Sequence, residues 1–288
     1  MTELATISQD RIDQLTVLLG SKEEKVTGGS DFRLPKIKTN REPEDDQGRA
    51  LKMGSFYLEG AEENIYSTGD VKFRVLSHTF QYILYDSATN SVANKTIIKP
   101  NFKGEFRDIK GGNKMGKPSS KAIREMPPEE ADKWKNHKCW RQMRGVVSYK
   151  GVTASGEERD VVNVPCILMH ASGSYFNFEN EFIKALPRGK NIYDFESTLS
   201  ASKIKVGGNT FYQIHFKPIF SNPLPIDEKV IETMEVFANM IKGENSYVER
   251  QYNNSMKEDI LDAEAEQALD EEMLNQDQSD LGSDLEDK

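Results

Sequence analysis

The sequence predicts a mainly β protein with a few helices, and three segments support this expectation. Residues 71–86, VKFRVLSHTFQYILYD, alternate side-chain character and are rich in the aromatic and β-branched residues that suit pleated strands. Residues 139–149 and 160–169 have a similar composition, and Gly156 marks a hairpin-type connection between them. About seven strands of this kind fit a Greek-key barrel of the OB type with extensions, and a β-sandwich is the alternative.

Before the first clear strand, the pattern is less regular. Residues 8–19 predict a short helix with Ser8 as its N-cap, followed by a loop over 20–31. Residues 32–40 indicate an edge strand, because Pro35 cannot donate a hydrogen bond within a sheet. Residues 51–60 alternate weakly and indicate a further strand.

Regular patterning fades between Ser87 and Glu130, where glycine and proline recur. A segment of this length without secondary structure is typical of a functional or disordered loop. Further along the chain, 176–186 indicates a short helix, 191–199 and 203–217 indicate strands, and 226–242 has the spacing of an amphipathic helix.

These assignments divide the chain into three parts. Residues 1–30 form an N-terminal helix and loop, and 31–252 form a β-rich body with a long basic loop at 87–130. Residues 253–288 are acidic and of low complexity, which predicts a mobile tail.

Charge is distributed unevenly along the chain. The net charge is -9, but residues 251–288 carry thirteen acids against two lysines, a net charge of -11, so residues 1–250 sum to +2. Residues 95–150 carry fifteen Lys and Arg against six Asp and Glu, a net charge of +9. The acidic overall balance therefore does not argue against binding to a polyanion.

The chain has two cysteines, too few for a disulfide framework, which predicts a reducing compartment. No apolar run approaches the roughly 18 residues of a membrane span, and the first fifteen residues lack the features of a secretory signal. A cytoplasmic protein without membrane association is expected.

The stretch 134–149, WKNHKCWRQMRGVVSY, combines aromatic and cationic residues with a strand pattern. Alternation places Trp140, Gln142 and Arg144 on one face and Cys139, Arg141 and Met143 on the other. A single nucleic-acid strand offers phosphates to cations and unstacked bases to planar side chains. The alternative is that the aromatic residues are core and the cations form a solvated face. The residues expected to bind nucleic acid are Lys99, Phe102, Lys103, Phe106, Arg107, Lys110, Lys114, Lys117, Trp134, Lys138, Trp140, Arg141, Arg144 and Tyr149.

Other motifs give weaker indications. GGNKMGKP (111–118) has the spacing of a phosphate-binding loop, but Pro118 replaces the required Ser or Thr. His137, Cys139, Cys166 and His170 have side chains that bind zinc, although their spacing is not that of a standard zinc site. His78 and His215 lie in strand patterns and suggest no role. No nucleophile or metalloprotease motif is present. We expect neither an enzyme nor a cofactor, with a metal-dependent nuclease as the catalytic alternative.

Together, the basic aromatic stretch, the strand at 73–86 and the terminal DQSDLGSDLEDK resemble phage single-stranded DNA-binding proteins, which have an OB-type body and an acidic tail. The resemblance implies a protein that coats exposed strands during replication and recombination, with a tail that docks replication proteins or occupies the binding groove. The residues this assigns to the tail contact are Asp280, Leu281, Asp284, Leu285, Glu286 and Asp287. DNA and RNA remain alternatives and the oligomeric state is open; a phage structural or assembly protein with a β-sandwich body is the rival.

Overall fold

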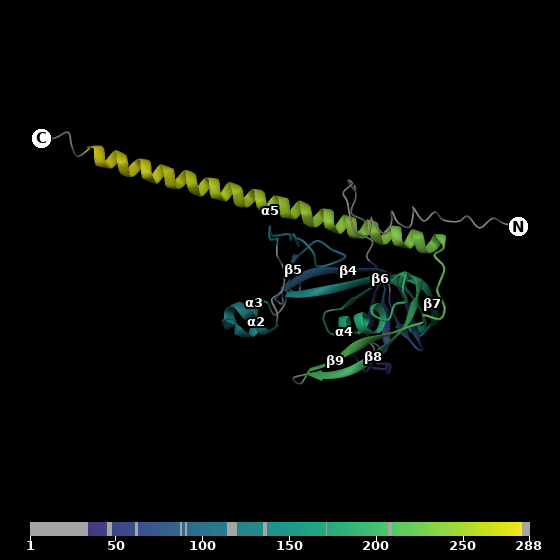
Figure 1. The fold of residues 1–288 in the computed structure, drawn as a ribbon. Helices are drawn as coiled ribbons and strands as arrows, with labels where there is room; N and C mark the ends of the chain where they lie inside the picture. Colours follow the sequence, from purple (N-terminus) through teal and green to yellow (C-terminus); the bar gives the residue numbers. More distant parts are fainter. Residues whose placement is uncertain are drawn as a thin grey trace.

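The strands form one mixed sheet, and Figure 1 shows a long helix lying along it. The computed structural model describes residues 34–44, 48–60, 63–86, 88–89, 91–113, 120–134, 137–170, 172–206 and 209–283, with the backbone alone for 120, 133, 172–173, 206, 209 and 258–283. The predicted helix at 8–19 and the loop at 20–31 lie outside the described residues. The prediction of a mainly β protein with few helices is confirmed.

Nine strands lie in the described part of the chain. They are β1 (Lys36–Thr39), β2 (Phe56–Glu59), β3 (Asn64–Ser67), β4 (Val71–Asp86), β5 (Ser91–Lys95), β6 (His137–Thr153), β7 (Glu158–His170), β8 (Glu196–Val206) and β9 (Asn209–Pro218). The helices are α2 (Ser120–Glu125), α3 (Pro128–Lys133), α4 (Ser172–Asn177), a π-helix η1 (Phe178–Ile183), a 3-10 turn η2 (Ile192–Asp194) and α5 (Glu228–Ser283).

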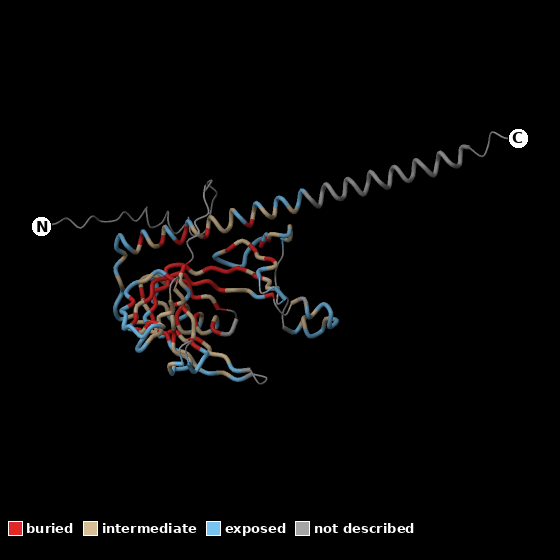
Figure 2. The backbone as a smooth tube through the Cα atoms, turned by 180° about the vertical axis from the view of Figure 1, so that it is seen from behind, coloured by how far each residue is buried: buried red, intermediate tan, exposed pale blue. Residues whose placement is uncertain are grey.

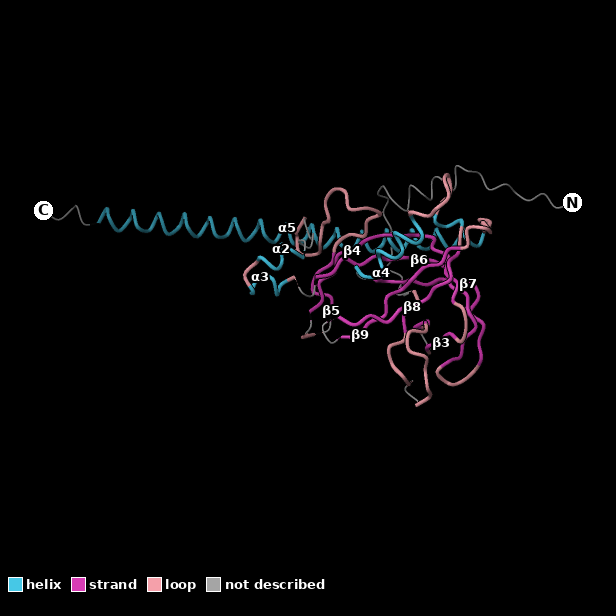
Figure 3. The backbone as a smooth tube through the Cα atoms, turned by 60° about the horizontal axis from the view of Figure 1, so that its bottom comes forward, coloured by secondary structure: helices cyan, strands magenta, loops and turns pink. Residues whose placement is uncertain are grey.

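The strand order is β3-β2-β1-β7-β6-β4-β8-β9, with β5 paired to β4. Strand β3 also pairs with the end of β6, through Ile65 opposite Thr153. The pairings β3–β2–β1–β7–β6–β3 therefore form a closed circuit, and the β1–β7 pairing is its parallel step. Figure 3 shows the strands of the sheet gathered together, with α5 along one side of them.

The longest pairing joins β4 and β6 and runs from Lys72 opposite Ser148 to Leu84 opposite His137. Both segments alternate apolar and polar residues, so one register places a set of side chains on each face. Gly145 allows the close approach of the two strands, because a Cβ there would collide with the backbone of Arg74.

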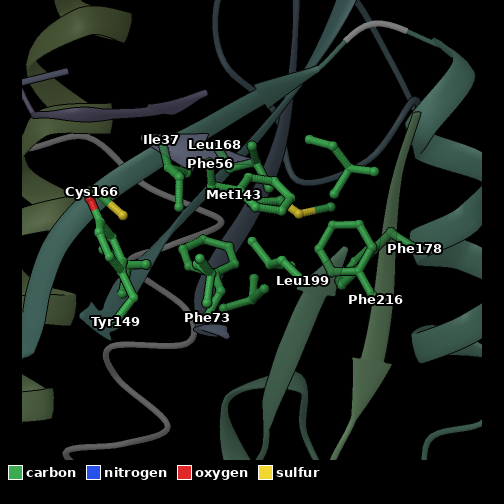
Figure 4. Packing of buried hydrophobic residues seen from close by; sticks show 14 of the residues in the cluster. Ile37, Phe56, Phe73, Met143, Tyr149, Cys166, Leu168, Phe178, Leu199 and Phe216 are labelled. Atoms are coloured by element: carbon green, nitrogen blue, oxygen red, sulfur yellow. The ribbon is translucent and has the colours of Figure 1, made fainter. Parts of the chain in front are cut away.

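One face of this pair contributes to the main hydrophobic core. Phe73, Met143 and Leu168 from the sheet pack with Phe178 and Phe216, and all five side chains are buried. Figure 4 shows these rings and aliphatic side chains directed toward one another. The π-helix η1 covers this side of the core and buries Phe178 and Phe182.

The opposite face is covered by α5. Leu76 and Val146 of the sheet pack against Met234 and Phe237 of the helix. Asp227 caps the helix, since its carboxylate accepts the backbone N–H of Val230 at 2.9 Å. Figure 2 shows buried residues concentrated in the long strands and in the turns of α5 beside them.

Two segments differ from the sequence expectation. The basic loop at 87–130 contains β5, α2 and α3, and it folds back on β4 through the bridge between Phe80 and Lys99. The predicted helix at 226–242 is the beginning of α5, which continues to Ser283 through residues expected to be mobile. Ala, Glu, Gln, Leu and Met predominate there, and their high helix propensity is the local reason for the continuation. Among the described residues, no helix combines the length and apolarity needed to cross a membrane.

We expect the change Phe237→Ala to lower the free energy of unfolding by about 3–5 kcal/mol, because it removes a fully buried ring between α5 and the sheet. Urea unfolding followed by circular dichroism measures this loss. The adjacent change Val236→Ala is the control, since Val236 is exposed. Equal losses in the two variants would contradict the packing of α5 described above.

Candidate nucleic-acid interface

An open groove of about 850 Å³ runs past the ends of β1, β6 and β7 and along β9. Strand β7 ends at His170, opposite Arg141, so its pairing with β6 stops there. Residues 137–140 of β6 pair with β4 on one side, and the described residues place no strand on their other side, which the groove passes. Its wall includes both cationic and aromatic side chains. These side chains, with one imidazole beside them, include Lys36, Lys38, Arg41, Lys138, Tyr57, Tyr66, Tyr85, Trp140, His170 and Tyr212.

Four cations line the groove, and the strand pattern explains two of them. Lys36 and Lys38 alternate with the buried Ile37 on β1, so both side chains leave the core face. Lys38 forms an ion pair with Glu59 at 2.5 Å. Arg41 follows the strand, and Lys138 lies at the start of β6; both are exposed. Among the described residues, the other charged lining residues are Glu42 and Glu44, so the described part of the wall carries a net positive charge.

Aromatic side chains lie between these cations. Tyr57 and Tyr66 face each other across β2 and β3, with ring centroids 5.3 Å apart. At another part of the wall, Trp140 packs edge-on against Tyr85 at 6.2 Å. Tyr212 packs against Gly54, where a Cβ would meet the ring at 2.8 Å. Flat surfaces beside cations are the combination that single nucleic-acid strands require.

The groove also reaches buried polar groups without partners. His170 is 6% exposed, and neither of its ring nitrogens has a hydrogen-bond partner among the described residues. The indole N–H of Trp140 is likewise buried and unpartnered. Such atoms are costly in a folded protein, and a ligand or a water molecule is the usual reason for their presence.

His170 connects the groove to the half-buried His78 and the buried Arg141. Arg141 lies opposite both Phe80 and His170 in the sheet register, and His78 is two residues from Phe80 on the same face. Burial, together with the charge of Arg141, lowers the pKa of both His78 and His170 to about 3, so both imidazoles are neutral at pH 7. Burial also lowers the pKa of Arg141.

The structure places two of the predicted binding residues, Lys138 and Trp140, in the groove. A second group lies on the folded-back loop after β5: Lys99, Phe102, Lys103, Phe106, Arg107 and Lys110. Lys103 and Lys110 are exposed, and Phe102 is 50% exposed. The ammonium of Lys99 donates to the carbonyls of Lys103 and Glu105.

The loop after β5 is held against α5 by side-chain contacts. Asn245 of α5 accepts the N–H of Ile98 at 2.6 Å and donates to its carbonyl at 3.0 Å. Arg107 lies over the ring of Tyr252, and Lys95 forms an ion pair with Glu244 at 2.7 Å. Part of the positive charge predicted to face nucleic acid is therefore engaged with the helix.

Four predicted binding residues are buried, contrary to an exposed binding role. Phe106 packs edge-on against Tyr82. Tyr149 lies in the main core and donates its hydroxyl hydrogen bond to the carbonyl of Ile65. Arg141 and Arg144 are 3% and 6% exposed. The alternation in the sequence placed Arg141 and Arg144 on opposite faces of β6, as the structure does, but both faces of the strand are covered.

Arg144 belongs to a buried polar network beneath α5. Its guanidinium donates to Thr79 at 3.1 Å and to Gln142 at 2.7 Å. Gln142 then donates to Gln81 at 2.6 Å, and Gln81 reaches Glu244 of α5 at 3.4 Å. Hydrogen bonding of this kind offsets the cost of removing a charge from water.

The remaining predicted residues lie apart from the groove or outside the described residues. Trp134 packs on His137 beside α3. Lys114, Lys117, Asp284, Leu285, Glu286 and Asp287 are outside the described residues, and Asp280 and Leu281 are described only as backbone of α5. The zinc alternative is not supported, since Cys166 lies in the main core and the described residues contain no group of three metal-binding side chains.

Most of the groove wall was not predicted from the sequence. Lys36, Lys38, Arg41, Tyr57, Tyr66, Tyr85 and Tyr212 were not selected. The spacing of the two lysines in KIKTNR was an available signal, since residues two apart share a face of a strand. No local signal joins β1 to β6 and β9, because their meeting depends on the sheet order.

His215 was expected to have no role, but it links three elements. Its Nδ1 lies 2.7 Å from Glu181 of η1, and its Nε2 lies 2.8 Å from the hydroxyl of Ser202 on β8. The order of groups is that of a Ser–His–carboxylate triad. However, the second oxygen of Glu181 accepts the backbone N–H of Phe216, and Ser202 does not line the groove. The contacts tie the β8–β9 hairpin to η1.

Comparison with known proteins gives no match, whether to a protein-family model, to a curated protein or to a solved structure.

We expect the stability of the protein to fall as the pH is lowered from 6.5 toward 3. The unfolded imidazoles of His78 and His170 bind protons in this window and the folded ones do not. Each contributes about 1.4 kcal/mol per pH unit, so lowering the pH from 6.5 to 5.0 costs about 2 kcal/mol per imidazole. The measurement is urea unfolding at several pH values. The change His170→Gln should remove roughly half of the two-histidine contribution to the slope; a slope identical to that of the natural chain would show that His170 is not buried neutral.

Proposed function

We propose that the protein binds single-stranded DNA along the groove between β1, β6 and β9, without catalysing a reaction on it. The observation that supports this most directly is the mixture of four cations and several flat aromatic side chains on one groove wall. A groove that follows the backbone with cations while bases stack on aromatic rings is the usual design of proteins that bind single strands without strong sequence preference.

The groove residues fall into two roles in this proposal. Lys36, Lys38, Arg41 and Lys138 neutralise phosphates, which makes affinity fall as salt rises. Trp140 and the tyrosines supply stacking surfaces, each stacked base being worth about 1–3 kcal/mol. The exposed Phe102 and Lys103, on the loop beside β4, extend the same chemistry beyond the groove.

The sheet topology is compatible with an OB-type body. The closed circuit of pairings among β1, β2, β3, β6 and β7 uses five strands, the number in an OB barrel. In this proposal β4, β8, β9 and α5 are extensions, and the groove crosses the outside of the circuit. The acidic segment after α5 leaves the body would then contact replication proteins or compete for the groove.

We expect the double change Lys36→Gln and Lys138→Gln to weaken binding to a thirty-nucleotide oligo-dT and to lower its salt dependence. Each lost phosphate contact reduces the slope of log K against log salt by about 0.7. Fluorescence anisotropy across several salt concentrations measures both quantities, and oligo-U in the same assay compares RNA with DNA. Lys121→Gln is the matched control, since its side chain is 82% exposed and lies outside the groove. Absence of binding by the natural chain, together with self-assembly, would instead favour the structural protein.

A chain that ends at Lys257 should bind oligo-dT more tightly at low salt. Residues 258–288 carry thirteen acids and one lysine, and their removal keeps the described contacts between α5 and the sheet. If the segment competes for the groove, the gain disappears at high salt because salt screens the attraction. A full-length chain with these acids replaced by Asn and Gln is the control for charge. Unchanged affinity in both variants would exclude autoinhibition.

A further inference from the structure

A cluster of one buried guanidinium and two neutral imidazoles lies next to the groove and has polar nitrogen atoms without partners among the described residues. Arg141, 3% exposed, has no hydrogen-bond partner for its Nε and Nη1 among the described residues. The Nε2 of His78 and both ring nitrogens of His170 are also unpartnered. The carboxylate of Glu179 forms an ion pair with Arg141, but its oxygen is 3.9 Å from Nη1, beyond hydrogen-bond distance.

The contacts of Arg141 leave a specific deficit. Its guanidinium stacks on the rings of Phe80, at 4.3 Å, and Tyr175. Ring faces attract a cation but accept no strong in-plane hydrogen bond, so the N–H groups at the edge still need acceptors. A buried charge without them costs several kcal/mol. Arg144, on the other face of the same strand, donates to Thr79 and Gln142. Arg144 leaves only its Nε without a partner among the described residues, whereas Arg141 lacks partners for both Nε and Nη1, so the deficit is larger at Arg141.

The surroundings of the cluster also point to a ligand with flat groups. Phe80 packs against Phe102 at 4.0 Å, and Tyr175 packs against Phe176 at 5.3 Å. Phe102 is 50% exposed and Phe176 is 59% exposed. Arg141 is thus linked, through Phe80 and Tyr175, to two exposed rings that come from different parts of the chain. His170 lines the groove and provides the connection to it.

We propose that Arg141, with His78 and His170, binds one phosphate of a nucleic-acid strand, while Phe102 and Phe176 stack on bases of that strand. This inference rests on the proposed function. A phosphate oxygen accepts from several donors at once and matches the two N–H groups of a guanidinium edge. Each neutral imidazole supplies one further N–H. The half-buried Tyr175, on the six-residue helix α4, is the side chain that moves to admit the phosphate.

The test compares Arg141→Met and Phe176→Ala with the control Lys121→Gln. Arg141→Met should reduce the salt slope for oligo-dT by about 0.7 and weaken binding roughly tenfold or more. Phe176→Ala changes an exposed ring and should keep the fold. It should weaken binding by roughly 5- to 150-fold, as the loss of one stacked base predicts. Urea unfolding of each variant verifies folding.

Inorganic phosphate provides a second arm that does not depend on DNA binding. It should raise the unfolding temperature of the natural chain relative to chloride at equal ionic strength, and Arg141→Met should abolish the increase. If oligo-dT binds the natural chain and the two variants with the same affinity and salt slope, the proposed phosphate site at Arg141 is wrong. The proposal that the groove binds single-stranded DNA then stands. If oligo-dT does not bind but phosphate stabilises through Arg141, the anion site stands and the proposed function is wrong. If oligo-dT does not bind and phosphate does not stabilise the natural chain, both the proposed function and the phosphate site are wrong.

Discussion

The structure depends on the burial of polar side chains on both faces of the β4–β6 pair. Strand β6 carries Arg144 toward α5 and Arg141 toward α4, and neither guanidinium reaches bulk water. Removing such a charge from water costs several kcal/mol unless hydrogen bonds replace the lost hydration. Each face must therefore be covered by an element that supplies acceptors as well as apolar contacts.

Helix α5 meets this requirement on its face of the sheet. Its apolar residues pack on Leu76 and Val146. Farther along the helix, Glu244 accepts a hydrogen bond from Gln81, and Asn245 accepts one from the backbone N–H of Ile98. The same helix holds the loop after β5, so α5, the buried network and this loop are connected by direct contacts. A long helix with only part of its length against the sheet fits this role (Figure 1).

The face toward α4 is satisfied less completely, and the candidate binding surfaces lie beside it. The groove reaches His170, and the cluster of His78, Arg141 and His170 retains polar nitrogen atoms without partners among the described residues and is linked to two exposed aromatic rings. Buried groups that a protein leaves unsatisfied are expected where a ligand completes them. Arg141 and Arg144 lie three residues apart on β6 and differ in this respect. The terminal nitrogens of Arg144 donate to Thr79 and Gln142, whereas Nε and Nη1 of Arg141 have no partner among the described residues.

The sequence by itself determined the mainly β class, the amphipathic start of α5 and the alternation that assigns Arg141 and Arg144 to opposite faces, because these follow from local periodicity. Among the residues predicted from the sequence to bind nucleic acid, Lys138 and Trp140 line the groove. Only the tertiary structure decided that both faces of β6 are covered, which buries Arg141, Arg144 and Tyr149 instead of exposing them. It likewise brought Lys36 and Tyr212 beside Trp140, since the partners of a strand are set by sheet order and long-range packing rather than by the residues next to it in sequence.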